Sequence, residues 1–183
     1  MTKIGIFLDR DGVLNINTHY PHLIEDCYPA PTAKKAMERI LADDRFIPIV
    51  VTNQGGVGQG HYSKRDCFSF QLELMRQLDC TIPRRQWYHS WATEDNHFLR
   101  KPNPGMLLRA AQDHDIDLGQ SAMFGDKESD MLAGIKAGCC AVYLIGEGRP
   151  SLFSQVDAFM EATCQTTNDL TSDSRYPKGR LPR

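Results

Sequence analysis

The stretch Phe7-Leu8-Asp9-Arg10-Asp11-Gly12-Val13 ends a short apolar run near the start of this 183-residue chain. The run, residues 4–8, predicts a buried strand, and Gly12 predicts its end. Open parallel α/β sheets carry their chemistry outside the carboxyl ends of the strands. Two carboxylates placed two residues apart at such an end can point the same way and hold a divalent cation. Asp9 and Asp11 therefore predict a site suited to phosphoryl transfer.

Outside this stretch, apolar runs alternate with amphipathic segments, which indicates a parallel α/β sheet. Further strands are expected at residues 47–51, 87–91, 121–124 and 140–145. Helices are expected near residues 32–41, 63–79, 104–114 and 129–137. Beyond residue 146 the pattern weakens, and residues 171–183 are polar and proline-containing, so we expect them to be loosely ordered.

Individual residues predict finer details of these elements. Pro48 indicates that the second strand starts there or lies at a sheet edge. Residues 52–60 are typical of a glycine-rich loop, and Thr32 is expected to cap the first helix. The buried face of the helix at residues 63–79 is expected to carry Phe68, Leu72, Met75 and Leu78.

Composition excludes several classes of protein. The formal net charge is −2, from 21 basic and 23 acidic residues, so no nucleic acid or anionic membrane is expected as a partner. No apolar run reaches the length of a membrane span and no signal peptide is visible, so we expect a cytoplasmic protein, with a monomer favoured. The six cysteines lack CxxC spacing and are expected to be free thiols.

Polar residues gather at four places, each at or just beyond an expected strand end. Taken singly, each has an ordinary interpretation as a turn, a solvated pair or a helix start. Because parallel strands end at one edge of the sheet, all four are expected to converge. The four segments are Asp9 with Asp11, Thr52-Asn53-Gln54, Arg100-Lys101-Pro102-Asn103-Pro104 and Gly125-Asp126-Lys127-Glu128-Ser129-Asp130.

These residue types form a working set for a phosphate ester. One carboxylate can attack phosphorus, and a second can protonate the leaving oxygen. A lysine with hydroxyl or amide donors can hold the phosphoryl oxygens. Mg²⁺ takes oxygen ligands, which suits Asp9, Asp126 and a backbone carbonyl.

In this order, the motifs DRDGV, TNQGG, RKPNPGM and GDKESD resemble the four motifs of the haloacid dehalogenase (HAD) superfamily of phosphatases. More narrowly, they are similar to the heptose-1,7-bisphosphate 7-phosphatases and histidinol-phosphate phosphatases, over residues 3–145. The resemblance implies an α/β fold with a three-layer Rossmann-like core and a parallel sheet. The short intervals between motifs imply that there is no separate cap domain. Residues 1–150 are then the phosphatase domain, and residues 151–183 a C-terminal extension.

The same resemblance implies roles for individual residues. Asp9 would be the nucleophile and Asp11 the general acid/base, while Thr52 and Lys101 would bind the transferring phosphoryl group. The metal, Mg²⁺, would take Asp9, Asp126 and the Asp11 carbonyl. Lys127 and Asp130 would support this centre. Substrate contacts would come from Asn53, Arg100, Asn17 and Tyr20.

The chain departs from these relatives in a loop that usually holds structural zinc through a Cys-x-His and a Cys-x-Cys. Here the corresponding residues are His89-Ser90-Trp91 and His97-Phe98-Leu99, which offer only two nitrogen ligands. Structural zinc needs four ligands, so we do not expect it. We expect Trp91, Phe98 and Leu99 to hold the loop by apolar packing. Asn17 is a second departure, because the heptose enzymes tend to have an aspartate there.

The sequence thus predicts a Mg²⁺-dependent hydrolase of phosphate monoesters that works through an aspartyl-phosphate. Its expected substrate is a small phosphorylated metabolite, such as D-glycero-D-manno-heptose 1,7-bisphosphate. Histidinol phosphate or another small metabolite remains an alternative substrate. A non-catalytic phosphate-binding protein on the same fold is a further alternative, and the short intervals between motifs argue against a capped phosphomutase.

Overall fold

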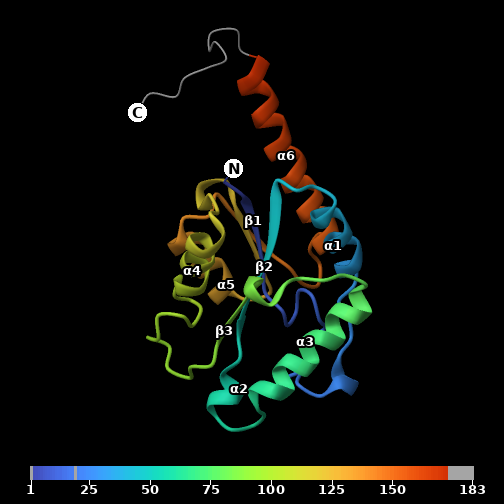
Figure 1. Ribbon diagram of the computed structural model, residues 1–183, viewed down its shortest axis with the longest axis vertical. Coiled ribbons are helices and arrows are strands. Elements are labelled where there is room, and N and C mark those ends of the chain that lie inside the picture. The colour runs from blue at the N-terminus through green and yellow to red at the C-terminus, as the bar shows by residue number, and fades with distance from the viewer. Residues whose placement is uncertain (1, 19, 173–183) are drawn as a thin grey trace.

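The computed structural model describes residues 2–18 and 20–172, and its centre is a parallel sheet of five strands in the order β3-β2-β1-β4-β5 (Figure 1). The strands are β1 (Ile4–Leu8), β2 (Phe46–Asn53), β3 (Trp87–Ser90), β4 (Ala122–Gly125) and β5 (Ala141–Leu144). The helices are α1 (Ala33–Leu41), α2 (Gly55–Gly58), α3 (Lys64–Leu78), α4 (Gly105–His114), α5 (Glu128–Ala137) and α6 (Leu152–Ser172), with short 3-10 turns η1 (Ile24–Asp26), η2 (Arg84–Gln86) and η3 (Leu118–Gln120).

A hydrophobic core lies on each face of the sheet, and successive side chains of β1 enter the two cores alternately. Ile6 and Leu8 pack into the core that α1, α3 and α6 cover, whereas Phe7 packs into the core that α4 and α5 cover (Figure 1). All three side chains are fully buried. The predicted three-layer α/β core is therefore confirmed, and no separate cap domain is present among the described residues.

The register of the sheet brings the ends of three strands together. Leu8 pairs with Val50 of β2 on one side and with Phe124 of β4 on the other. Asp9, the next residue, donates its backbone N–H to the Phe124 carbonyl at 2.9 Å. The residues that follow β1, β2 and β4 therefore meet at one edge, as expected for parallel strands.

Two predictions about β2 and the residues after it were wrong. Pro48 is the third residue of β2 and not its start, and β2 is not an edge strand, because β1 and β3 flank it. Pro48 is tolerated because β3 pairs only with residues 50–53, so β1 is the single strand opposite it. The expected loop at residues 52–60 is shorter, since β2 continues to Asn53 and the one-turn helix α2 follows.

The predicted face of α3 was correct only in part. Met75 and Leu78 are buried, as expected, whereas Leu72 is 71% exposed and Phe70 and Leu74 are fully buried. One residue rotates a helix by about 100°, so a face inferred from a few apolar positions is easily displaced. Ser63 and Asp66 form a capping box at the start of the helix. By contrast, Thr32 makes no side-chain capping bond to α1.

The helix α6 occupies the region where the sequence pattern weakened. Val156, Phe159 and Met160 lie in the core beside α1, and Arg39 pairs with Asp157 at 2.7 Å. Residues 171 and 172 belong to this helix, and the remainder of the expected loose tail, residues 173–183, lies outside the described residues. Cys27, Cys67, Cys80, Cys139 and Cys140 are free, as expected. None of the helices described is long and apolar enough to cross a membrane.

Candidate active site

The centre of the site is the ion pair between Asp9 and Lys101. The Lys101 ammonium lies 2.9 Å from Asp9 Oδ1, and both residues are buried. Lys101 also lies 2.6 Å from Asp130 Oδ1 and donates to the Val51 carbonyl at 2.8 Å. Asp9, Lys101 and Asp130, which belong to three separate motifs of the sequence, thus meet at the end of β1.

Asp126 and Asp130 complete a carboxylate cluster with Asp9. Oxygen atoms of the three residues lie within 4.8 Å of one another. Asp126 Oδ1 is buried and accepts no hydrogen bond from any described residue. Asp130 Oδ2, by contrast, accepts the Lys127 backbone N–H at 3.0 Å. An orphaned carboxylate oxygen in an all-oxygen cluster fits a hard divalent cation.

Two glycines permit this close packing. Gly12 has φ +90°, and a Cβ built on it would lie 2.2 Å from Asp126 Oδ2. A Cβ on Gly125 would meet the Asp130 side chain at a similarly prohibitive distance. The glycines of DRDGV and GDKESD therefore make room for the carboxylate cluster, since any larger residue would displace it.

Burial dominates the electrostatics of the cluster. Desolvation raises the pKa of Asp9 to about 7, against the opposing charge of Lys101, and Asp130 and Asp11 raise it further. Desolvation also raises the pKa of Asp126, with Lys127 opposing. For Lys101, burial alone would lower the pKa, but Asp9 and Asp130 outweigh it and raise the pKa. The site is thus a place where added positive charge is favoured.

Asp11 is held from two sides. Arg10 donates from Nε to Asp11 Oδ1 and from Nη2 to Oδ2, both at 2.8 Å, in a bidentate pair. The Arg10 side chain is buried, donates also to the Pro21 carbonyl, and lies over the Phe70 ring. Gln54 Nε2 donates to Asp11 Oδ2 at 3.1 Å.

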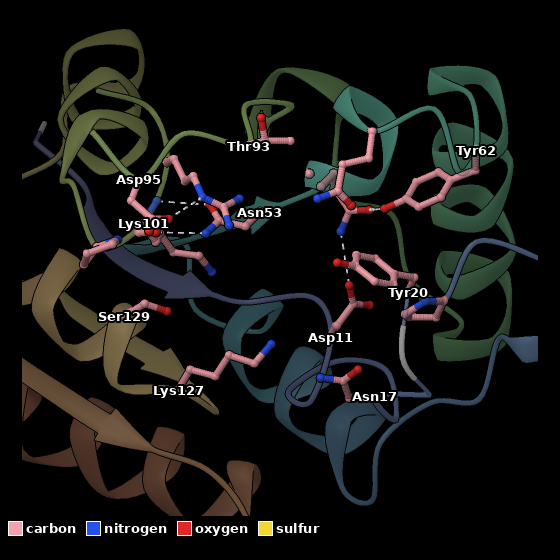
Figure 2. Close-up of a pocket in the computed structure, with 16 residues that line it drawn as sticks. Asp11, Asn17, Tyr20, Asn53, Tyr62, Thr93, Asp95, Lys101, Lys127 and Ser129 are labelled. Carbon is pink, nitrogen blue, oxygen red and sulfur yellow. Dashed lines mark hydrogen bonds and ion pairs between the residues drawn. The ribbon is translucent and has the colours of Figure 1, made fainter. Parts of the chain in front are cut away.

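Asp9 and Asp11 line one small recess, of about 40 Å³, together with Thr52, Asn53, Lys101, Lys127, Ser129 and Asp130. Five of these residues also line a larger open pocket of about 650 Å³. Figure 2 shows Asp11, Lys101, Lys127 and Ser129 around this pocket. Asn17 and Tyr20, from the segment that follows β1, also line it. The recess and the pocket together can take a phosphoryl group and the molecule attached to it.

All four residues predicted to contact substrate line the larger pocket. Asn53 is nevertheless engaged with the chain itself, because its amide exchanges two 3.0 Å hydrogen bonds with the Lys101 backbone. Arg100 donates to the Ala92 carbonyl and pairs with Asp95 at 3.2 Å. Asn17 approaches Asp126 Oδ2 at 3.5 Å, and Tyr20 has a left-handed φ of 57°.

Several residues of the site had no role in the sequence interpretation. Gln54, Ser129 and Arg10 belong to the motifs, and this position indicated that they lie near the site. Their contacts could not be predicted, because they depend on the fold. Tyr62 and Asp95 also line the pocket, and they lie in segments with no motif. Nothing in the sequence around these two residues indicates that they reach the site.

The loop at residues 89–99, where no structural zinc is expected, is organised by aromatic rings. The His89 ring stacks on Trp91 at 4.8 Å between centroids and on Trp87 at 6.2 Å. His97 is exposed, and its Nδ1 accepts the Leu99 backbone N–H. Trp91 and Leu99 are partly buried, as expected, but Phe98 is 59% exposed, so the expectation that it packs into the loop was wrong.

The buried imidazole of His89 predicts a pH dependence of stability. Desolvation, with the charges of Arg10 and Arg84, lowers its pKa from 6.5 to about 4. The unfolded chain therefore binds the proton more readily, and stability is lost as pH falls from 6.5 toward 4, by about 2–3 kcal/mol at pH 4.5. His89→Phe, which keeps a stacking ring, should lose this part of the pH dependence in urea unfolding at pH 7 and 4.5. His97→Phe is the exposed control, and an unchanged pH dependence in His89→Phe would contradict the assignment.

Comparisons with known proteins agree with the architecture of this site. A model of the HAD-hydrolase-like family matches residues 98–158. The chain is 36% identical over 143 residues to the D-glycero-beta-D-manno-heptose-1,7-bisphosphate 7-phosphatase of Helicobacter pylori, a match that covers 74% of this chain and 80% of that protein. It is 36% identical over 161 residues to the D-glycero-alpha-D-manno-heptose-1,7-bisphosphate 7-phosphatase of Burkholderia mallei, covering 79% and 81%.

Solved structures share the fold. A HAD-like phosphatase from Mesorhizobium loti superposes with a TM-score of 0.73 at 27% identity, covering 88% of each chain. The D,D-heptose 1,7-bisphosphate phosphatase of B. bronchiseptica, solved with magnesium and phosphate, gives a TM-score of 0.75 at 23% identity and covers 87% of this chain and 99% of that one. By its sequence identity over most of its length, the chain belongs to the HAD-like hydrolases and is a HAD-type phosphatase homologous to the heptose-1,7-bisphosphate 7-phosphatases.

Proposed function

We propose that this phosphatase hydrolyses D-glycero-D-manno-heptose 1,7-bisphosphate or a closely similar sugar phosphate, through a phosphoryl group carried on Asp9. The observation that supports this most is the Asp9–Lys101 pair at 2.9 Å, which lines one recess together with Asp11. A nucleophilic carboxylate, a cation for phosphoryl oxygens and a second carboxylate are the groups that the reaction needs.

In the first step, Asp9 attacks phosphorus. Its Oδ1 is engaged by Lys101 and by the Arg10 backbone N–H at 2.7 Å, so Oδ2 carries the attack. The Oδ2–P bond forms as the ester P–O bond breaks, and the leaving oxygen takes a proton from Asp11. Asp11, now ionised, takes a proton from water, whose oxygen attacks phosphorus and releases phosphate and free Asp9.

Lys101 and Thr52 hold the transferring group in this proposal. Lys101 is buried, so its charge acts on phosphoryl oxygens with little screening by solvent. Thr52 is also buried and lines the same recess. Ser129, which lines the recess as well, adds a second hydroxyl.

Asp9 and Asp126 would hold the metal, with the Asp11 carbonyl as the backbone ligand that the family resemblance implies. The orphaned Asp126 Oδ1 and the all-oxygen donor set fit Mg²⁺. Asp130 is already engaged by Lys101 and the Lys127 N–H, so it supports the centre. Mg²⁺ held there would supply positive charge to offset the negative charge on the phosphoryl group. All these residues lie within residues 1–150, the proposed phosphatase domain.

The wide polar pocket suits a sugar phosphate. Arg100 and Lys127 supply positive charge at its wall, while Asn17, Tyr20 and Asn53 supply hydrogen-bonding groups. Steady-state kinetics on heptose 1,7-bisphosphate, histidinol phosphate and a panel of phosphorylated metabolites test the assignment. We expect the highest kcat/KM on the heptose bisphosphate. A higher value on histidinol phosphate would overturn the substrate, and phosphate binding without turnover of any substrate would overturn the function.

The metal assignment predicts that stabilisation by Mg²⁺ grows with pH. The pKa of Asp9 is raised to about 7, so between its unfolded value of 3.8 and 7 the metal-free folded protein binds more protons than the unfolded chain. Metal-free stability is therefore lost as pH rises through this window. Mg²⁺ competes with these protons, so its Kd should be higher at pH 5 than at pH 8. A Mg²⁺ concentration of a hundred times the Kd at pH 8 should add about 2.7 kcal/mol to the free energy of unfolding at pH 8, and the same concentration should add clearly less at pH 5.

Thermal unfolding with Mg²⁺ or with a chelator, at pH 5 and pH 8, measures this difference. Asp126→Asn should lose most of the Mg²⁺ response. Asp113→Asn, on α4 and outside the site, is the matched control and should keep it. An equal shift at both pH values would contradict the assignment.

A further inference from the structure

Gln54 lies at the end of β2 between two groups of the proposed mechanism. Its Nε2 donates to Thr52 Oγ1 at 2.8 Å and to Asp11 Oδ2 at 3.1 Å. The residue is 1% exposed, so these bonds do not compete with bulk water. One amide group therefore contacts both the proposed acid/base and the proposed phosphoryl-binding hydroxyl.

The orientation of the Gln54 amide is set on its other side. Gln54 Oε1 accepts the Tyr62 hydroxyl proton at 2.7 Å and faces the Cys67 thiol at 3.7 Å. Both Asp11 oxygens accept hydrogen bonds from Arg10 here, so the donor end of the Gln54 amide, its NH₂ group, faces Asp11 Oδ2. Tyr62 is itself 8% exposed, and the His22 ring stacks on it at 4.6 Å. A flipped amide would set its own oxygen against Asp11 Oδ2 in place of the present N–H donor.

This arrangement has a consequence for Thr52. A hydroxyl has one proton to donate and two lone pairs to accept with. Since Thr52 Oγ1 accepts from Gln54, its own proton is directed elsewhere, and none of the described residues accepts it. Thr52 lines the recess with Asp9, so the proton is available to a phosphoryl oxygen.

We infer that Gln54, oriented by Tyr62, is a positioning residue that sets the Asp11 carboxylate and the Thr52 hydroxyl for reaction together. The inference rests on the proposed function of Asp11 as general acid. Arg10 holds Asp11 as well, but Gln54 is the contact that links Asp11 to Thr52. Loss of the amide should therefore damage proton delivery to the leaving group more than it damages phosphoryl transfer itself.

The test compares two leaving groups. A sugar oxygen needs a proton as it departs, whereas p-nitrophenolate does not, and kcat/KM reports the steps up to the first transfer. Gln54→Met keeps length and burial but has no N–H donor. We expect its kcat/KM to fall by about 10²-fold on the heptose bisphosphate, the lower end of what general acid catalysis contributes, and by about tenfold or less on p-nitrophenyl phosphate. A merely structural defect would lower both values alike.

Tyr62→Phe is the second variant, because it keeps the ring stack and removes only the hydroxyl that orients Gln54. It should show the same selective loss in weaker form. Its matched control is Tyr88→Phe. This substitution removes a 2.8 Å hydrogen bond from the phenol to Asp113, which lies outside the site, and it should leave both kcat/KM values unchanged. If Gln54→Met fails to fold, Tyr62→Phe decides the question.

The two proposals fail in different ways. Equal losses on both substrates in the Gln54 and Tyr62 variants, alongside a selective loss in Asp11→Asn, would overturn the role of Gln54 and leave the proposed function standing. A wild-type protein that hydrolyses neither substrate would overturn the proposed function itself.

Discussion

Asp9→Asn is expected to abolish hydrolysis, with kcat reduced by more than about 10⁴-fold, as when other covalent enzymes lose their nucleophile. A carboxamide has no anionic oxygen to attack phosphorus, and it cannot carry the phosphoryl group. The fold should survive, because Lys101 keeps its 2.6 Å contact with Asp130. Turnover of p-nitrophenyl phosphate and of the heptose bisphosphate measures the loss.

The control for this variant is a second asparagine at an aspartate outside the site, Asp113→Asn, which should retain wild-type turnover. Thermal unfolding should show that Asp9→Asn remains folded. Activity of the folded Asp9→Asn protein within tenfold of wild type would show that Asp9 does not carry the reaction.

Of the substitutions considered, Lys101→Met is expected to lower the free energy of unfolding most, and it should also lower activity. The substitution leaves Asp9 and Asp130 buried without their shared cation. Removing one partner of a buried ion pair destabilises a protein by about 3–5 kcal/mol. Turnover should fall as well, because the charge that holds the phosphoryl group is gone. Urea unfolding in the presence of a chelator measures the stability term.

The loss in the free energy of unfolding caused by Lys101→Met should be smaller at low pH. Unpaired buried carboxyls have raised pKa values, so they take up protons and lose their charge as pH falls. Unfolding at pH 5 and pH 8 therefore separates this cause from a packing defect, which would be equal at both. Lys127→Met is the matched control, since Lys127 is exposed and its loss should cost less than about 1 kcal/mol. A deficit in Lys101→Met no larger than this would contradict the buried ion-pair description.

The fold and the convergence of the motifs could be predicted because both follow from strand ends. Once residues 4–8 are a strand of a parallel sheet, Asp9 must lie at the edge where Thr52 and Gly125 also emerge. Lys101 was predictable only through the RKPNPGM motif, since it follows no strand directly. The bond between its ammonium and Asp130 could not be read from spacing, because it depends on how α5 packs.

Other features depend on three-dimensional packing that single-sequence patterns do not carry. The buried face of α3 differs from the predicted one because Leu72 points to solvent, while Phe70 supports the Arg10 guanidinium. Gln54 has a function in the site only because Tyr62, eight residues later, bends back to its amide. Neither contact corresponds to a periodic pattern of residues in the sequence.

The central claim is that hydrolysis proceeds in two displacements at phosphorus, with Asp9 carrying the phosphoryl group between them. Each in-line displacement inverts the configuration of phosphorus, so two displacements retain it. The direct measurement uses a phosphorothioate monoester made chiral with two oxygen isotopes and hydrolysed in water of the third isotope. Retention of configuration in the thiophosphate product is the predicted result. Inversion would show that water attacks the substrate directly, and it would contradict a phosphoryl–Asp9 intermediate.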